Sequence, residues 1–365
     1  MRSFHPIFYA SLIVLAVSNA GCDIGIKILQ KVATAVQEVE VKETPLEYHQ
    51  RRMREVDGPG WTDLHRAAAK GDVATVQKLL DLGVPVDVRE HKGGTPLYEA
   101  TRRGQLDVMK LLLKNGADVD DAGQEGLCTP LCLAAEYNQV EAARLLLKHG
   151  ADINHQTTFG NTPLHMASMQ TWHGDSEIVQ LLIEEGKADM NLLSYSGCYA
   201  LYCAVNKNHT PAALYLLSKG ADANYMHPGG TSTLYAAVFR QNYKVTKALL
   251  DKGANPNALF KNRNTPLQRT VLNNDLVITR LLLQYKADPN LIHGDTKPPL
   301  YSALLGHKKE LIRVLLEHGA DPMLKVRDHT IYDYAVFQND QEVLGLITQQ
   351  RLKSIKEQRK KKKAA

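Results

Sequence analysis

The sequence predicts an all-α solenoid, in which short helix-turn-helix units stack side by side. A Thr-Pro-Leu-like turn recurs at intervals of 33, 34, 33, 37, 33, 33, 33 and 32 residues. Two short stretches of helical periodicity follow the turn, and most units close on Gly-Ala-Asp or a variant of it. The turn falls at Thr62, Thr95, Thr129, Thr162, Tyr199, Ser232, Thr265, Pro298 and Thr330. A period in this range indicates a repeat array and not a single-core globule.

Each unit carries the residues that a pair of stacked helices needs. A Thr hydroxyl at the turn can accept hydrogen bonds from the free N–H groups of the first helix, and Pro suits the first helical turn because its missing donor is not needed there. The Leu runs at 111–113 and 145–147 form the apolar face of the second helix, and small pairs such as Ala134 and Ala135 let neighbouring first helices approach closely. No unit can bury its Leu face alone, so stacking must bury it between neighbours.

The motif is the same in several units. Residues 94–100 read Gly-Thr-Pro-Leu-Tyr-Glu-Ala, followed by Leu-Leu-Leu at 111–113 and Gly-Ala-Asp at 116–118, and residues 160–167 and 264–267 repeat the first part. This pattern resembles the ankyrin repeat. The resemblance covers residues 60–350 and implies an all-α ankyrin-repeat solenoid of about eight helix-turn-helix repeats plus a C-terminal capping repeat. It also implies a protein-binding array that is not an enzyme.

The N-terminal residues 1–21 have the pattern of a signal peptide. Arg2 precedes an apolar run from Ile7 to Val17, which is too short to span a bilayer but suits a signal-peptide core. The small residues that end at Cys22 resemble the lipobox of a bacterial lipoprotein, which makes Cys22 the expected lipid attachment site. Ordinary cleavage after Ala20 is the alternative. The prediction is a lipoprotein in the bacterial cell envelope that faces the periplasm, with the inner and outer membranes both left open.

Residues 22–59 lie between this signal and the repeats, and residues 351–365 follow them. We expect 22–59 to be a lipidated tether that holds the array off a membrane, or a cap on the first repeat. The 351–365 tail holds eight basic residues and one acid, a net charge of +7, which leaves −2 for the rest of a +5 chain. The tail is either a solvated end or attracted to anionic headgroups. The array itself has no basic excess that would favour nucleic acid.

The array contains four further cysteines, and no catalytic motif is visible. Cys128 and Cys198 occupy the same slot two repeats apart, which at about 8–10 Å per helix layer exceeds the ~7 Å limit between the Cα atoms of a disulfide. The spacing of Cys128 and Cys132 suits a disulfide poorly, and neither pair has the spacing of a zinc site. We therefore expect buried thiols that act as small hydrophobes, with no metal and no cofactor.

The partner-binding surface is expected on the concave side, where the first helices and the turn tips before them line up. The apolar candidates have the composition of an interface core: Leu133, Tyr137, Phe159, Met166, Met169, Trp172, Tyr195, Phe239 and Phe260. A basic group flanks them: Arg66, Lys70, Arg102 and Arg103. The alternative for several of these side chains, especially Leu133 and Phe239, is packing between helices. Trp172 lies in an insertion that lengthens the fourth repeat.

These features lead to one main functional hypothesis and two alternatives. The main one is a non-enzymatic lipoprotein that holds a protein partner, as an inhibitor or immunity protein that neutralises a secreted toxin or envelope enzyme. Such a role is similar to those seen among bacterial ankyrin lipoproteins. The alternatives are a periplasmic scaffold for envelope or stress-defence proteins and a host-directed ankyrin effector. In each case we expect a protein partner, no nucleic acid, membrane contact through Cys22 and the tail, and a monomer when unbound.

Overall fold

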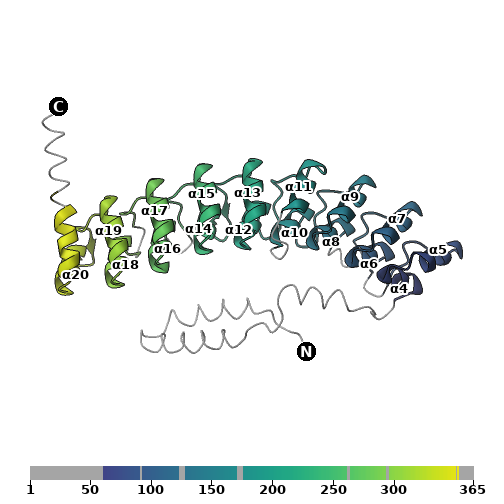
Figure 1. Ribbon diagram of the computed structural model, residues 1–365, viewed down its shortest axis with the longest axis horizontal. Helices are drawn as coiled ribbons and strands as arrows, with labels where there is room; N and C mark the ends of the chain where they lie inside the picture. Colours follow the sequence, from purple (N-terminus) through teal and green to yellow (C-terminus); the bar gives the residue numbers. More distant parts are fainter. Residues whose placement is uncertain are drawn as a thin grey trace. The chain divides into compact units, whose positions relative to one another are not determined.

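The fold is a row of stacked helix pairs, seen in a computed structural model of the chain (Figure 1). The structure describes residues 61–90, 93–122, 128–170, 176–260, 264–292, 296–350 and 352. Within these ranges, eight helix pairs follow one another, and one further helix, α20 (Ile331–Phe337), begins the last unit, in which residues 341–350 are also helical. The expected all-α solenoid of about eight repeats with a C-terminal cap is therefore confirmed.

The helices of each pair are short. The first helices are α4 (Asp63–Lys70), α6 (Pro96–Arg103), α8 (Pro130–Glu136), α10 (Pro163–Met169), α12 (Ala200–Asn206), α14 (Thr233–Phe239), α16 (Pro266–Asn273) and α18 (Pro299–Leu305). The second helices are α5 (Val73–Asp81), α7 (Leu106–Lys114), α9 (Val140–Lys148), α11 (Glu177–Glu184), α13 (Thr210–Ser218), α15 (Tyr243–Asp251), α17 (Leu276–Gln284) and α19 (Lys309–Glu317).

Two of the turns between repeats contain a small antiparallel hairpin that the sequence did not indicate. Strand β1 (Met226–His227) pairs with β2 (Thr231–Ser232), so that Met226 lies opposite Ser232. Strand β3 (Lys325–Val326) pairs with β4 (His329–Thr330). Each strand has only two residues, so these hairpins shape the turn tips and add no sheet to the fold.

The turn residues begin the first helices as the sequence predicts. The Thr95 hydroxyl accepts a hydrogen bond from the Tyr98 N–H at 3.3 Å, and the Thr129 hydroxyl does the same for Cys132 at 3.3 Å. A Pro occupies the first helical position in α6, α8, α10, α16 and α18. Where they occur, the cap and the Pro fix the residue at which a first helix begins.

The core runs along the array between the helix pairs. First helices pack on the neighbouring first helices, and second helices on the neighbouring second helices (Figure 1). Ala100, Ala134 and Ala167 are fully buried where first helices meet, and Leu112 and Leu182 are fully buried in the second helices. The Leu faces are thus buried by stacking, as expected for repeats that contact only their neighbours. Within the described ranges, no helix is both long and apolar enough to span a membrane.

A ladder of Asp and Asn side chains joins the loops of successive repeats. A side-chain oxygen of one loop accepts a hydrogen bond from a backbone N–H of the next loop. The Asp87 carboxylate does this for the Asp118 N–H at 3.2 Å, and Asn257 Oδ1 for the Asp288 N–H at 2.8 Å. The same link is made by Asp120, Asn154, Asn224 and Asn290. An amide and a carboxylate therefore serve the same purpose in different repeats.

We expect Asp87→Asn and Asp120→Asn to stabilise the array at neutral pH. Burial and neighbouring carboxylates raise the pKa of Asp87 and of Asp120, so their ionised forms are disfavoured. An amide keeps the acceptor oxygen without the charge. Urea unfolding should show a gain of less than about 0.5 kcal/mol for each change. The gain should be present at pH 7 and shrink as acid protonates the wild-type carboxyls. The reverse change, Asn257→Asp, should be destabilising, and a neutral or opposite result would contradict the argument.

Candidate protein-binding face

We call the surface formed by the first helices and the turn tips before them the first-helix face. The structure places the predicted residues on this face at different depths. Arg66, Lys70, Phe159, Tyr195 and Phe239 are exposed. The half-buried ones are Arg102, Arg103, Met166, Met169 and Phe260. Leu133 and Tyr137 are buried. Trp172 and Cys22 lie outside the described residues. Whether the accessible residues bind a partner stays a prediction.

The expected exposure of Leu133 and Tyr137 is wrong. Their exposed fractions are 3% and 5%, and they form a small separate cluster with Cys128 and Cys132. Tyr98 and Met166, from the repeats on either side, pack against this cluster. Cys132 occupies the position that holds a larger His or Tyr in most other repeats. Leu133 and Tyr137 therefore support the first-helix face from beneath.

The basic group at the N-terminal end is partly neutralised by nearby acids. Arg66 Nη1 lies 3.0 Å from Asp63 Oδ1, and Arg102 Nη2 lies 2.6 Å from Glu99 Oε2. The side chains of both Arg102 and Glu99 are mostly buried, so this pair is shielded from solvent. The sequence gives four cations here, but the geometry leaves a smaller net positive charge for a partner. We therefore place less weight on this group than on the apolar part of the face.

The turn tips carry exposed aromatic side chains that contact their neighbours. The Tyr195 N–H donates to the Phe159 carbonyl at 3.0 Å, which joins two successive tips, and Tyr195 is 74% exposed. Phe260 stacks on Tyr235, with ring centroids 4.6 Å apart and planes 5° apart. The first contact fixes the backbone of two tips whose Phe159 and Tyr195 side chains stay exposed, and the second holds the Phe260 ring in place. Ordered, exposed aromatic side chains are typical anchors for a protein partner.

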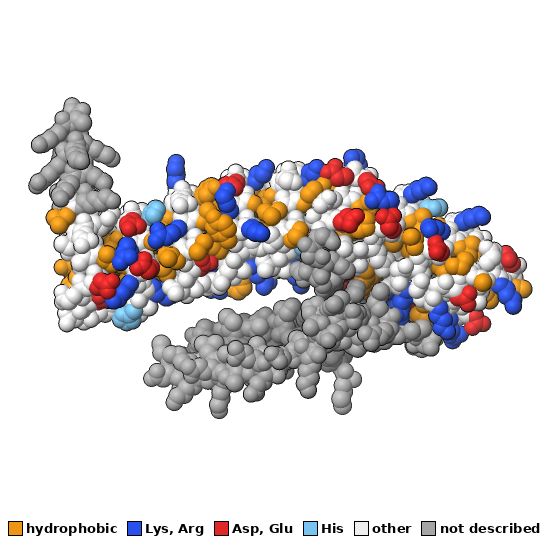
Figure 2. Space-filling model, viewed as in Figure 1, with side chains coloured by type: hydrophobic (Ala, Val, Ile, Leu, Met, Phe, Trp, Pro, Cys, Tyr) orange, Lys and Arg blue, Asp and Glu red, His pale blue; other side chains and the backbone are white. Residues whose placement is uncertain are grey.

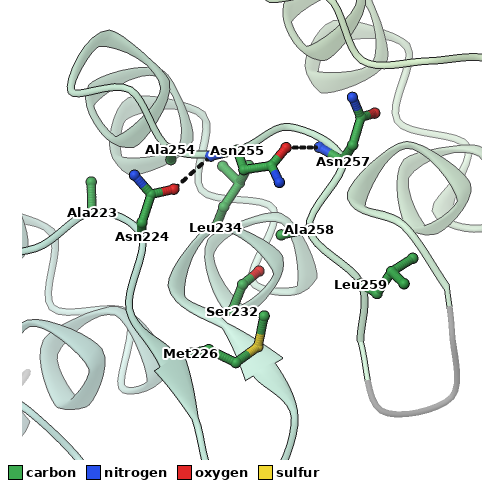
Figure 3. Close-up of a pocket in the computed structure, with 10 residues that line it drawn as sticks. All are labelled: Ala223, Asn224, Met226, Ser232, Leu234, Ala254, Asn255, Asn257, Ala258 and Leu259. Atoms are coloured by element: carbon green, nitrogen blue, oxygen red, sulfur yellow. Dashed lines mark hydrogen bonds between the residues drawn. The ribbon is translucent and has the colours of Figure 1, made fainter.

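A hollow of about 440 Å³ lies between two successive turn tips (Figure 3). Met226, Ser232 and Leu234 line it from one repeat, and none of its ten lining residues is charged. Its amides are already used: Asn224 Oδ1 accepts from the Asn255 N–H at 2.9 Å, and Asn255 Oδ1 accepts from the Asn257 N–H at 2.9 Å. The hollow therefore offers shape and apolar surface. Over the described part of the chain, no group of His, Cys, Asp or Glu could hold a metal ion.

The first-helix face carries a row of exposed apolar side chains, of which the sequence predicted only Phe239. The seventh residue of the first helix is apolar and exposed in four successive repeats. We call these residues the apolar row: Phe239 (49% exposed), Leu272 (52%), Leu305 (45%) and Phe337 (66%). They occupy one register position on α14, α16, α18 and α20, whose axes are packed at about 8–10 Å spacing. Comparing this one position across the repeats would have revealed the row.

Cations lie beside the apolar row. The Arg269 guanidinium is 4.5 Å from the ring centroid of Phe239, and Arg240 lies 5.9 Å from the same ring. Lys308 Nζ donates to the Leu272 carbonyl at 3.1 Å. Figure 2 shows hydrophobic side chains interspersed with Lys and Arg along the array. On α14, α16, α18 and α20 the one acid is Asp333, whose carboxylate accepts hydrogen bonds from Thr330 in a helix cap. The row is therefore apolar with a positive edge.

Comparison with known proteins identifies the repeat. The family described as "Ankyrin repeats (3 copies)" matches residues 15–122, 64–157, 120–192, 169–260 and 234–326. The chain belongs to the ankyrin-repeat family. Its array is similar to the human ASB11 ankyrin repeat domain, with a TM-score of 0.54 and 26% identity over 63% of this chain and all of that one. The expected ankyrin fold is therefore confirmed, and this fold is a protein-binding scaffold.

Similar curated proteins match this chain over part of its length. A putative ankyrin repeat protein of Fowlpox virus, FPV240, is 48% identical over 60 residues, which are 16% of this chain and 15% of that protein. The nuclear factor NF-kappa-B p105 subunit of Gallus gallus is 30% identical over 163 residues, 44% of this chain and 16% of that one. The chain thus spans less than a fifth of the length of either relative.

Ankyrin repeats one and four are joined to their neighbours by a buried histidine. In the fourth, His165 Nδ1 accepts from the Thr162 N–H at 3.2 Å, and His165 Nε2 lies 2.8 Å from the Cys198 carbonyl of the next repeat. His65 is arranged in the same way against Gly94, at 3.0 Å. In the seventh repeat, Gln268 takes over both roles, accepting from the Thr265 N–H and donating to the Lys297 carbonyl. Glutamine is therefore a natural substitute in this slot.

We expect the double variant His65→Gln and His165→Gln to be less sensitive to acid than the wild type. Burial lowers the pKa of both imidazoles, so the folded state resists protonation while the unfolded chain binds protons near 6.5. The two histidines therefore cost the wild type no stability above pH 6.5, and its free energy of unfolding falls as the pH drops below that value. The loss is at most about 1.4 kcal/mol per pH unit for each histidine.

The measurement is urea unfolding at pH 7 and pH 5. The double variant should lose much less stability between the two values, because glutamine keeps the hydrogen bonds and does not titrate. The control variant, His149→Gln, removes an exposed histidine and should keep the wild-type pH dependence. An unchanged pH dependence in the double variant would mean that other groups set the acid sensitivity.

Proposed function

We propose that this ankyrin array holds a protein partner on its first-helix face and that the apolar row is the centre of the contact. The observation that carries the proposal is the apolar row itself: four large apolar side chains, each at least 45% exposed, at one position of four successive helices. Contiguous exposed apolar surface on a folded protein commonly marks an interaction site. The protein acts by binding and carries out no reaction of its own.

The partner segment that fits best is an acidic amphipathic helix. Successive members of the apolar row are about 8–10 Å apart. Apolar residues seven positions apart on a helix are separated by about 10.5 Å, so one helix laid along the row can contact each member in turn. The cations Arg240, Arg269 and Lys308 then face the flank of that helix. Arg269 is only half-buried, so its guanidinium can pair with a carboxylate of the partner.

The broader setting of this binding rests on the sequence. We propose that Cys22 is lipidated and anchors the array in a bacterial envelope, facing the periplasm, and that the basic tail assists at the membrane. The partner in that setting is a secreted toxin or an envelope enzyme, which the array neutralises by covering it. The features that support this are the lipobox-like residues before Cys22 and the +7 tail. A scaffold for several envelope proteins is the second candidate function.

A designed probe tests the proposed contact. The probe is a synthetic helix of about 22 residues, with Leu at every seventh position and Glu on the flanks. We expect it to bind the full chain, with an affinity that falls as salt is added, because part of the attraction is electrostatic. A matched peptide with Lys in place of Glu should bind at least about tenfold more weakly, which corresponds to ~1.4 kcal/mol. Fluorescence anisotropy measures both affinities.

Matched variants locate the contact on the protein. Changing Phe239, Leu272, Leu305 and Phe337 together to Ala should weaken probe binding at least about tenfold. The control variant changes four exposed apolar residues outside the row, Leu82, Tyr243, Val277 and Met323, and should bind like wild type. Equal effects of the two variants, or no preference for the acidic peptide, would count against this site.

The envelope setting needs a separate test. Expressed in a bacterial host, the wild type should gain the mass of a diacylglycerol and an acyl chain on Cys22, and Cys22→Ser should not. Cells that lack the protein should become sensitive to the toxin that the array normally neutralises. The variant without the apolar row should fail to protect these cells. An unmodified N-terminus at Gly21 would refute the lipoprotein proposal, whatever the probe shows about binding.

A further inference from the structure

Two thiols lie together at the start of α12, in the fifth repeat. Cys198 precedes the N-cap residue of this helix and is half-buried, whereas Cys203 lies in the fourth helical position and is 7% exposed. They occupy the N′ and N4 positions, whose side chains commonly pack against each other at a helix start, and no disulfide joins them. One thiol of the pair is thus open to solvent, and the second is held directly behind it.

Polar groups surround the accessible thiol. Ser196 Oγ donates a hydrogen bond to Cys198 Sγ at 3.5 Å, and the His227 side chain, from strand β1, also hydrogen-bonds to the thiol. The His227 ring stacks on the Tyr202 ring, with centroids 4.9 Å apart and planes 13° apart. The imidazole is therefore held in place from two sides. It can stabilise a negative charge on the sulfur.

These contacts divide the two thiols into different chemical roles. The hydrogen bond with Cys203, followed by those with Ser196 and His227, lowers the pKa of Cys198 to about 5 despite its partial burial. The pKa of Cys203 is raised by the same hydrogen bond, by burial and by the charge on Cys198. The other titratable groups that act on the pair are Tyr202, Tyr225, His165 and Lys207. These contacts therefore favour the thiolate form of Cys198 and the thiol form of Cys203.

The other cysteine pair gives an internal comparison. Cys128 and Cys132 are also hydrogen-bonded to each other at the start of a first helix. Both are buried, within the cluster that holds Leu133 and Tyr137. Among the residues that perturb Cys132, no histidine takes the place that His227 takes beside Cys198. One thiol pair thus has a half-buried member, Cys198, whereas both thiols of the other pair are buried.

We propose that Cys198 and Cys203 form a peroxide-responsive thiol pair that closes into a disulfide. In the first step, the Cys198 sulfur attacks an oxygen of a hydroperoxide, the O–O bond breaks, and the leaving alkoxide or hydroxide takes up a proton. Cys198 becomes a sulfenic acid. In the second step, the Cys203 sulfur attacks the Cys198 sulfur, the S–O bond breaks, and the hydroxide leaves as water with the proton of Cys203. Two thiols and one hydroperoxide thus give one disulfide, one alcohol or water, and one further water.

Closing this disulfide acts on the turn tip of the same repeat. The Cys198 carbonyl accepts from His165 Nε2 and from the Ser194 N–H at 3.0 Å, and the Cys198 N–H donates to Ser194 Oγ at 3.0 Å. These bonds hold the tip that carries Tyr195. Drawing the Cys198 sulfur toward Cys203 changes the geometry of that tip, which belongs to the first-helix face. The thiol chemistry itself does not depend on the proposed binding function.

The test exposes the folded full chain to hydrogen peroxide and then measures the mass of its peptides. Cys198 and Cys203 fall in one tryptic peptide, and Cys128 and Cys132 fall in another. We expect the first peptide to lose two hydrogens and to regain them with a dithiol reductant, while the second stays reduced. In Cys203→Ser, a 1,3-dione reagent should trap the sulfenic acid on Cys198. In Cys198→Ser, neither product should form. Circular dichroism checks that this variant is folded.

A second readout follows the thiolate directly. The rate of Cys198 alkylation by iodoacetamide should stay high from pH 8 to pH 6 and fall only as the pH passes below about 5. In the Cys128→Ser, Cys132→Ser variant, both this profile and the disulfide should be unchanged. Oxidation of the Cys128 and Cys132 peptide at the same rate, or the absence of a disulfide and of a trapped sulfenic acid, would overturn the proposal.

Discussion

Leu216→Ala is expected to lower the free energy of unfolding by about 2–5 kcal/mol, the range found for truncation of a buried leucine. Leu216 lies in α13 and is fully buried, in a fold where each second helix packs between its neighbours. The substitution removes apolar contacts and leaves a cavity that rigid neighbours fill only partly. Since whole domains are stable by only about 5–15 kcal/mol, this one change is a large fraction of the total.

The effect should also be local. Each repeat contacts only its neighbours, so a weakened repeat can open without unfolding the far end of the array. Urea unfolding followed by circular dichroism gives the total loss, and hydrogen exchange should show reduced protection centred on α12 to α15. The control, Leu305→Ala, truncates an exposed leucine and should change stability by less than about 0.5 kcal/mol. Similar losses for the two variants would contradict the packing described for α13.

The features that sequence predicts best are those set within one repeat. Capping by Thr95 and Thr129, Pro at the first helical position and the Leu faces all depend on residues a few positions apart. These local features recur in many of the repeats, so the period reveals them. For this reason, the number of helix pairs and the C-terminal cap could be predicted from the residues alone.

The candidate face was predicted less well because exposure depends on neighbouring repeats. Leu133 and Tyr137 are buried in a cluster with Cys128 and Cys132, against which Tyr98 and Met166 of the adjacent repeats pack. Phe239 was predicted on the face, with interhelical packing as the alternative, and its ring is exposed beside the Arg269 guanidinium. The position of a residue within its repeat fixes the direction of its side chain. Its burial depends also on the size of the residues that pack against it from the repeats on either side.

Gly160→Ala should produce the other large loss of stability, at a turn tip of the first-helix face. Gly160 has a φ of +73°, in the left-handed region that favours glycine. A Cβ atom there would lie 2.5 Å from the Tyr195 backbone nitrogen and 2.6 Å from Tyr195 Cδ1. The backbone strain alone is about 1–2 kcal/mol. The contact with the Tyr195 backbone adds to it, because no side-chain rotation can relieve it.

The chain provides a matched control for the strain. Gly253 has a φ of +83°, and a Cβ atom there would meet no atom within 4 Å. Gly253→Ala therefore measures the backbone strain by itself, and Gly160→Ala measures the strain together with the clash. We expect Gly160→Ala to have the lower urea midpoint of the two, with extra hydrogen exchange in the turn tips that carry Phe159 and Tyr195.

The difference between the two glycine variants also tests how the first-helix face is organised. The Tyr195 N–H donates to the Phe159 carbonyl, so a methyl group at Gly160 pushes apart two tips that otherwise hold each other. If the tips abut in solution, Gly160→Ala must lose more stability than Gly253→Ala, and the environments of Phe159 and Tyr195 must change together. Equal losses would mean that the tips move independently. The exposed aromatics would then offer a partner separate contacts instead of one ordered surface.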